Sequence, residues 1–132
     1  MGHAAFDVSV LSGARILIVE DEFYLADDLA CALKEAGAEV LGPAATLGEA
    51  QAYVDGNGFD CAILDMNLRG DLAFPVADRL AAAGIPFLIV TGYSVASLPE
   101  RFAEVRRIEK PSDTRKVIEA LPPLLAAKVK HL

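Results

Sequence analysis

The stretch "FDCAILDMNLRG", residues 59–70, joins an apolar run to an abrupt charged end. Residues 61–64 are continuously apolar, which is typical of a buried strand, and the run stops at Asp65. A polar turn follows and finishes at Gly70. Because burying an unpaired charge costs free energy, a carboxylate at this position is expected to have a partner. The stretch therefore predicts a buried strand with a functional group at its carboxyl end.

Apolar runs of strand length recur on both sides of this stretch and alternate with helical spacing. Strands are predicted at residues 15–20, 38–42, 59–65, 86–91 and 105–108. Helices are predicted at residues 22–36, 46–55, 71–84 and 112–121, with a short helix near 97–103. Thr46 and Ser112 are the expected N-caps of two of these helices. Pro75 fits only a first helical turn, and Pro122 with Pro123 should interrupt the last helix before residues 124–130.

Strand followed by helix, repeated along the chain, predicts an α/β fold: a doubly wound parallel sheet with helices on both faces. The strand at 105–108 is less apolar than the others, which favours an edge position. One domain at residues 14–130 is expected after a short, loosely ordered lead-in at residues 1–13. A chain of 132 residues is long enough to bury one core of this kind.

Composition argues against several classes of function. The net charge of −7 disfavours a nucleic-acid surface, because such surfaces neutralise phosphates with Lys and Arg. No apolar run approaches the roughly 18 residues of a membrane span, and the first residues lack a secretion pattern, so a cytoplasmic protein is expected. Cys31 and Cys61 fall in helix and strand patterns, as small buried residues do. His3 and His131 lie at opposite ends of the chain and provide no zinc ligand set.

Reactive side chains follow the predicted carboxyl ends of four strands, the edge at which an open parallel sheet binds its ligands. They are Glu20, Asp21, Asp65, Thr91 and Lys110. Clustered carboxylates raise one another's pKa unless a cation intervenes, and Mg²⁺ prefers carboxylate oxygens. Asp21 and Asp65 are expected to bind Mg²⁺ directly and Glu20 through a water molecule. Asp65 would then be a nucleophile that forms an acyl phosphate.

Four short motifs resemble, in the correct order, those of the receiver domain of two-component response regulators. They are "ILIVEDE" (16–22), "ILDMNL" (63–68), "VTGY" (90–93) and "EKP" (109–111). The resemblance covers about residues 14–130 and implies a flavodoxin-like receiver fold with strand order 2-1-3-4-5. It implies that Asp65 accepts the phosphoryl group and that Glu20 and Asp21 hold Mg²⁺ or Mn²⁺, joined by the backbone carbonyl of Asn67.

The same resemblance gives roles to the remaining motif residues. Thr91 would hydrogen-bond the phosphoryl group, Lys110 would pair with it, and the Lys110–Pro111 peptide bond would be cis. Arg107 stands where most relatives carry an aromatic ring that reports phosphorylation by turning inward. The segment between Thr91 and Lys110 is shorter than usual, which predicts a stunted fourth helix.

"PFLIVTGYS" (86–94) is similar to a subclass with Thr-Gly followed by an aromatic residue, often stand-alone receivers of alphaproteobacteria that lack the aromatic switch. We hypothesise that Tyr93 replaces the missing ring. Thr91 would draw the following loop toward the phosphoryl group, and Gly92 would give that hinge its freedom.

The resemblance implies a single-domain response regulator rather than an enzyme, with at most autodephosphorylation. It would receive phosphate from a histidine kinase or phosphotransfer protein and signal by docking to a protein target, without DNA or membrane binding. Homodimerisation stays open, as does excision from a longer protein. Two other classes are a receiver-like binding module that needs no phosphorylation, and a Mg²⁺-dependent phosphatase of the haloacid-dehalogenase type. The latter needs a second aspartate where this sequence has Asn67.

Overall fold

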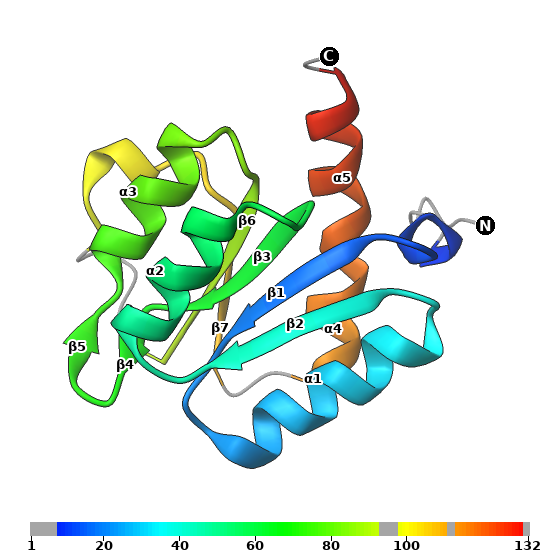
Figure 1. The fold of residues 1–132 in the computed structure, drawn as a ribbon, viewed down its shortest axis with the longest axis horizontal. Helices are drawn as coiled ribbons and strands as arrows, with labels where there is room; N and C mark the ends of the chain where they lie inside the picture. Colours follow the sequence, from blue (N-terminus) through cyan, green and yellow to red (C-terminus); the bar gives the residue numbers. More distant parts are fainter. Residues whose placement is uncertain (1–7, 93–97, 111–112, 131–132) are drawn as a thin grey trace.

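The computed structural model describes residues 8–92, 98–110 and 113–130 (Figure 1). Its centre is a five-stranded parallel sheet in the order β2-β1-β3-β6-β7. The strands are β1 (Arg15–Val19), β2 (Glu39–Ala44), β3 (Cys61–Asp65), β6 (Phe87–Thr91) and β7 (Arg107–Glu109). The predicted doubly wound sheet and its 2-1-3-4-5 order are confirmed, and the fifth strand lies at an edge as expected.

Helices cover both faces of this sheet (Figure 1). One core contains side chains of α2 (Leu47–Gly56) and α3 (Phe74–Ala82). The opposite core contains side chains of α1 (Phe23–Glu35), α4 (Thr114–Glu119) and α5 (Leu121–Lys130). Side chains alternate along β1, so that Leu17 packs into the first core and Ile18 into the second. The continuous apolar runs of the sequence therefore reflect strands that are buried on both faces.

Local sequence explains where several helices begin. The hydroxyl of Thr46 accepts a hydrogen bond from the backbone N–H of Glu49 at 3.2 Å, which confirms the predicted N-cap of α2. Pro75 lies in the first turn of α3, where its missing N–H costs nothing. The predicted interruption of the last helical segment is present, but it lies at Ala120, between α4 and α5, before the prolines rather than at them. Pro122 and Pro123 lie in the first turn of α5, where a missing N–H is tolerated.

The start of α3 was predicted too early. The structure begins this helix at Phe74 rather than at residue 71, because residues 67–72 form a small antiparallel hairpin of β4 (Asn67–Leu68) and β5 (Asp71–Leu72). Between these strands, Arg69 (φ 54°) and Gly70 (φ 91°) adopt left-handed conformations. Two such residues in succession suit a two-residue hairpin turn. A turn was expected at this point, but not the paired strands on either side of it.

Three other predictions need correction. The lead-in is not loose over residues 8–13, because the 3-10 helix η1 (Val8–Leu11) inserts Leu11, fully buried, into the core. Cys31 was expected to be buried but is exposed on α1, whereas Cys61 is buried as expected. The cap of α4 is Asp113, which accepts from the N–H of Lys116 at 3.1 Å; the predicted cap, Ser112, lies outside the described residues.

The segment between β6 and β7 contains, within residues 98–106, a single 3-10 turn, η3 (Glu100–Phe102). The short helix predicted near residues 97–103 is thus present over three of its positions. Across the described part of the chain, no helix is both long enough and apolar enough to span a membrane.

Candidate functional site

The predicted functional residues come together at the carboxyl edge of the sheet. Glu20 and Asp21 follow β1, Asp65 ends β3, and Thr91 ends β6. Lys110 follows β7, and its backbone N–H donates to the carbonyl oxygen of Thr91 at 2.8 Å. Parallel pairing therefore aligns the ends of these strands and fixes where each side chain starts.

Three carboxylates form the centre of the site. Glu20, Asp21 and Asp65 each offer an oxygen, and these oxygens all lie within 4.8 Å of one another. Glu20 and Asp65 are 3% and 4% exposed, so little water screens their charges. A set of carboxylate oxygens is the donor chemistry that Mg²⁺ and Mn²⁺ prefer. The cluster thus fits a hard divalent cation, as the sequence predicted.

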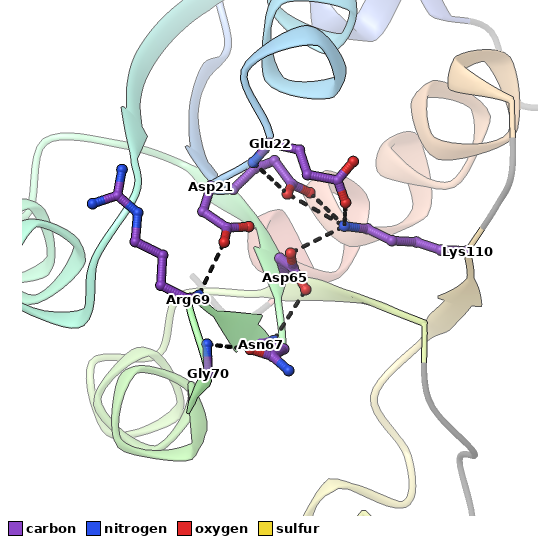
Figure 2. Close-up of polar contacts among 8 residues, drawn as sticks. Asp21, Glu22, Asp65, Asn67, Arg69, Gly70 and Lys110 are labelled. Carbon is purple, nitrogen blue, oxygen red and sulfur yellow. Dashed lines mark hydrogen bonds and ion pairs between the residues drawn. The ribbon is translucent and has the colours of Figure 1, made fainter.

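One ammonium group compensates part of this negative charge (Figure 2). Lys110 Nζ lies 3.0 Å from Asp65 Oδ2 and 3.0 Å from Glu20 Oε1. It also lies 3.3 Å from Glu22 Oε1. Burial alone lowers the pKa of Lys110, but its hydrogen bonds to Asp65 and Glu20 outweigh that effect and raise the pKa above the ordinary value. Lys110 is therefore charged at neutral pH and bridges the two most buried carboxylates.

The negative charge of Glu20 is only partly compensated by its neighbours. Burial raises the pKa of Glu20 to about 7, and the charge of Asp65 acts in the same direction. The backbone N–H of Glu22, which donates to Glu20 Oε2 at 3.0 Å, lowers this pKa, as does Lys110, but the two do not cancel the effect of burial. Near neutral pH the single positive charge of Lys110 is therefore too little for the three carboxylates, and a divalent cation would supply the rest.

The β4–β5 hairpin orients the other carboxylates through its backbone (Figure 2). Arg69 donates its N–H to Asp21 Oδ2 at 2.9 Å, and Asn67 donates its N–H to Asp65 Oδ1 at 3.0 Å. The side-chain oxygen of Asn67 accepts from the N–H of Gly70 at 2.8 Å, which closes the turn. The hairpin that displaces the start of α3 therefore belongs to the site.

Sequence reasoning missed two contributors, Glu22 and Arg69. Glu22 stands inside the motif "ILIVEDE" and was predicted only as the start of a helix, although a third consecutive acidic residue was a visible signal. Arg69 acts through its backbone, so its side-chain identity carried no signal. Arg107 is half-buried on β7. The predicted reporter Tyr93 and the predicted cis bond before Pro111 lie outside the described residues.

Two hollows meet at this edge. A crevice of about 400 Å³ is lined by Asp21, Asp65 and the hairpin turn, whereas Glu20 lines the neighbouring cavity. A cavity of about 520 Å³ opens beside it between α1, β6 and α4, with an apolar wall that includes Leu25, Leu29 and Val117. Glu22, Gly92 and Lys110 line both hollows and so separate them.

No family model matches the chain. Several solved structures, however, are similar to it. A response regulator receiver domain protein (CheY-like) from Methanospirillum hungatei JF-1 is similar with a TM-score of 0.80 and 29% identity, over 92% of this chain and 100% of that one. SdrG from Sphingomonas melonis Fr1 is 39% identical with a TM-score of 0.71, over 89% of this chain and 97% of SdrG. SdrG in a BeF3-activated conformation matches at 41% identity and the same TM-score.

Among curated proteins, the transcriptional regulatory protein TcrA of Mycobacterium tuberculosis is 41% identical over 83 residues, which are 61% of this chain. The match covers 32% of TcrA, so this chain corresponds to about a third of that relative.

Proposed function

The chain belongs to the family of response regulator receiver domains, and from this we propose that it accepts a phosphoryl group on Asp65 from a phosphohistidine. The observation that carries the proposal is the setting of Asp65. This carboxylate is buried at a strand end, with one oxygen held by the ammonium of Lys110 and the other by the N–H of Asn67. The receiver domain would occupy residues 14–130, with buried Leu11 tying the lead-in to its core.

Glu20, Asp21 and Asp65 would hold Mg²⁺ or Mn²⁺, together with the backbone carbonyl of Asn67. The clustered carboxylate oxygens support this ligand set. When bound, the ion would neutralise negative charge on the transferring phosphoryl group. Together with the ammonium of Lys110, the bound ion would offset the negative charge of the three carboxylates.

The transfer itself exchanges one bond for another. An oxygen of Asp65 attacks phosphorus and forms a P–O bond, while the P–N bond of the phosphohistidine breaks. The departing imidazole keeps the bonding electron pair and takes a proton from water. Lys110 pairs with the phosphoryl oxygens, and the hydroxyl of Thr91, at the next strand end, donates to them. No further catalytic group of this chain is required, which agrees with a signalling domain rather than an enzyme.

A donor protein needs a surface beside Asp65. Phe23 and Tyr24, at the start of α1, are 71% and 81% exposed and form an edge-to-face pair with ring centroids 5.4 Å apart. Exposed aromatic residues are enriched in protein–protein interfaces. We assign this pair to the contact with a sensor histidine kinase or histidine phosphotransfer protein in the cytoplasm. The phosphorylated chain would then signal by docking to a protein target rather than to DNA or a membrane.

Phosphotransfer tests this function directly. The wild type, mixed with Mg²⁺ and a radiolabelled phosphohistidine protein, should gain label, and Asp65→Asn should gain none while keeping its fold by circular dichroism. Asp71→Asn removes an exposed carboxylate of the nearby hairpin and should label normally. Label that persists on Asp65→Asn would move the acceptor elsewhere.

Beryllofluoride separates the alternative classes. The similar protein SdrG has a BeF3-activated conformation, so beryllofluoride should bind the Mg²⁺-loaded protein saturably, and phosphomonoesters should not be turned over. Turnover of a phosphomonoester would favour a phosphatase. Absence of both binding and labelling would favour a phosphorylation-independent binding module.

A further inference from the structure

Glu22 occupies the N-cap position of α1 but does not cap the helix. Asp, Asn, Ser and Thr are preferred at this position because their short side chains accept hydrogen bonds from the first turn. The Glu22 side chain makes no such bond. Its Oε1 instead lies 3.3 Å from Lys110 Nζ, although the residue is 65% exposed in its side chain. The side chain is therefore directed to the functional site and not to its own helix.

The ammonium of Lys110 has three N–H donors and three carboxylate neighbours. A phosphoryl group on Asp65 adds about 1.5 to 2 negative charges and three acceptor oxygens beside this ammonium. Lys110 must give up an existing contact to pair with them. Glu20 is buried and would lose its main cation, whereas Glu22 can be solvated by water. The contact to Glu22 is therefore the one that breaks at least cost.

We propose that Glu22 is a positioning residue that holds Lys110 in its resting place and so opposes phosphorylation of Asp65. Two effects act in the same direction: Glu22 competes for the ammonium, and its charge repels the incoming phosphoryl group. Glu22 borders both the 400 Å³ crevice and the 520 Å³ cavity, so its side chain has space to move away from Lys110. The residue sets how readily the site is activated. This inference rests on the proposed function.

Two substitutions separate the contact from the charge. Glu22→Gln keeps the length of the side chain and removes its charge. Glu22→Asp keeps the charge, withdraws it from Lys110 by one methylene, and is itself a better N-cap, so the fold is preserved. Asp27→Asn is the matched control, because it removes one charge from an exposed position on the same helix.

Beryllofluoride titrations at saturating Mg²⁺ measure the effect. Glu22→Gln should lower the half-saturating concentration about two- to five-fold, the size expected for one exposed ion pair. Glu22→Asp should lower it by a smaller factor, and Asp27→Asn should leave it unchanged. Equal shifts in Glu22→Gln and Asp27→Asn would mean that net charge acts rather than the contact with Lys110, and would overturn the proposal.

The ¹⁵N resonance of Lys110 Nζ gives a readout that a merely structural role would not move. Before beryllofluoride is added, Glu22→Gln and Glu22→Asp should both displace this resonance, and Asp27→Asn should not. An unmoved Lys110 resonance overturns the role of Glu22 whether or not Asp65 is an acceptor. A wild type that displays the Glu22-dependent resonance but binds no beryllofluoride would instead overturn the proposed function.

Discussion

Asp21 and Glu20 are neighbours in the chain but differ in how the protein holds them. Asp21 is partly exposed, with one oxygen fixed by the N–H of Arg69, so its other oxygen is left to face a cation. Glu20 is buried and is already bonded to Lys110 and to the N–H of Glu22. A direct metal contact therefore suits Asp21, and a water-mediated one suits Glu20.

This difference predicts unequal losses of Mg²⁺ affinity. Asp21→Ala should raise the half-saturating Mg²⁺ concentration by at least about tenfold, because a direct ligand is lost, and Glu20→Gln by a smaller factor. Nuclear magnetic resonance titration of the metal-free protein would measure both, with Asp27→Asn as the unaffected control. Wild-type affinity in Asp21→Ala would remove Asp21 from the ligand set.

The protonation of Glu20 predicts how metal binding depends on pH. Its pKa is raised to about 7 from the ordinary 4.5, so below pH 7 a growing fraction of the metal-free protein carries a proton on Glu20. A cation must displace that proton, so Mg²⁺ affinity should fall as the pH drops from about 8 to about 6, by up to about tenfold per unit well below the pKa.

Glu20→Gln removes the titrating group and should flatten this profile, although its affinity is lower throughout. A profile that keeps its slope in Glu20→Gln would assign the proton to another group. The comparison needs only Mg²⁺ titrations at several pH values.

The turn of the β4–β5 hairpin is important because backbone N–H groups of this hairpin hydrogen-bond the carboxylates of Asp21 and Asp65. Gly70 has φ 91°, and a Cβ added there would meet nothing within 4 Å. Gly70→Ala should therefore cost only the backbone strain of a left-handed L-residue, about 1 to 2 kcal/mol in the free energy of unfolding. Because Arg69 would shift with the turn, Mg²⁺ affinity should fall as well.

Gly48 provides the opposite control. It lies in the first turn of α2, where an added Cβ also meets nothing, so Gly48→Ala should raise the free energy of unfolding by about 0.5 to 1 kcal/mol. Denaturant titration of both variants measures the two signs. Equal stability of Gly70→Ala and the wild type would show that the hairpin turn relaxes without cost.

A larger element, the segment after β6, is anchored by packing. Phe102 is 2% exposed, with its ring centroid 6.0 Å from that of Phe74 on α3 and 6.4 Å from that of Phe87 on β6. Arg101 adds two hydrogen bonds to Asp78 of α3, at 2.7 and 3.0 Å. The far end of this segment is thus fastened to α3, while its near end begins at Thr91, in the functional site.

Over the whole molecule, the elements that carry a periodic sequence pattern could be predicted from the sequence. The geometry of individual side chains could not. Apolar runs such as residues 87–90 must be buried on both faces, so they identify strands without knowledge of their neighbours. The gathering of Asp65 and Lys110 followed from parallel topology, since strand ends share one edge. Leu11 was missed because its burial depends on α5, far along the chain, and the hairpin because two-residue strands have no period.

Dependence on distant parts of the chain also explains why two contacts at the site were not predicted. That Glu22 turns to Lys110 rather than to its own helix depends on a residue far along the chain. The N–H of Arg69 reaches Asp21 only because the hairpin turn is left-handed at that position. Local sequence does not encode either contact in a recognisable pattern, whereas it does encode which carboxylates end the strands.

Under the proposed function, we expect the response to a phosphoryl group on Asp65 to start at Thr91. This residue is 4% exposed, ends the strand beside Asp65, and accepts through its carbonyl from Lys110. A hydroxyl that moves toward the phosphoryl oxygens would draw on the segment that Phe102 fastens at its other end. A new charge can bias such a segment if its two arrangements differ by only a few kcal/mol.

Thr91→Ala should therefore uncouple residues 91–103 from beryllofluoride and leave Mg²⁺ binding intact, because the hydroxyl of Thr91 is not among the proposed metal ligands. Thr91→Ser keeps the hydroxyl and should retain the coupling. In the wild type, chemical shifts of Tyr93 should move on activation, and in Thr91→Ala they should not. If Tyr93 stays fixed while Arg107 and β7 respond, the signal leaves through the edge strand, and the replacement of the missing aromatic ring by Tyr93 is wrong.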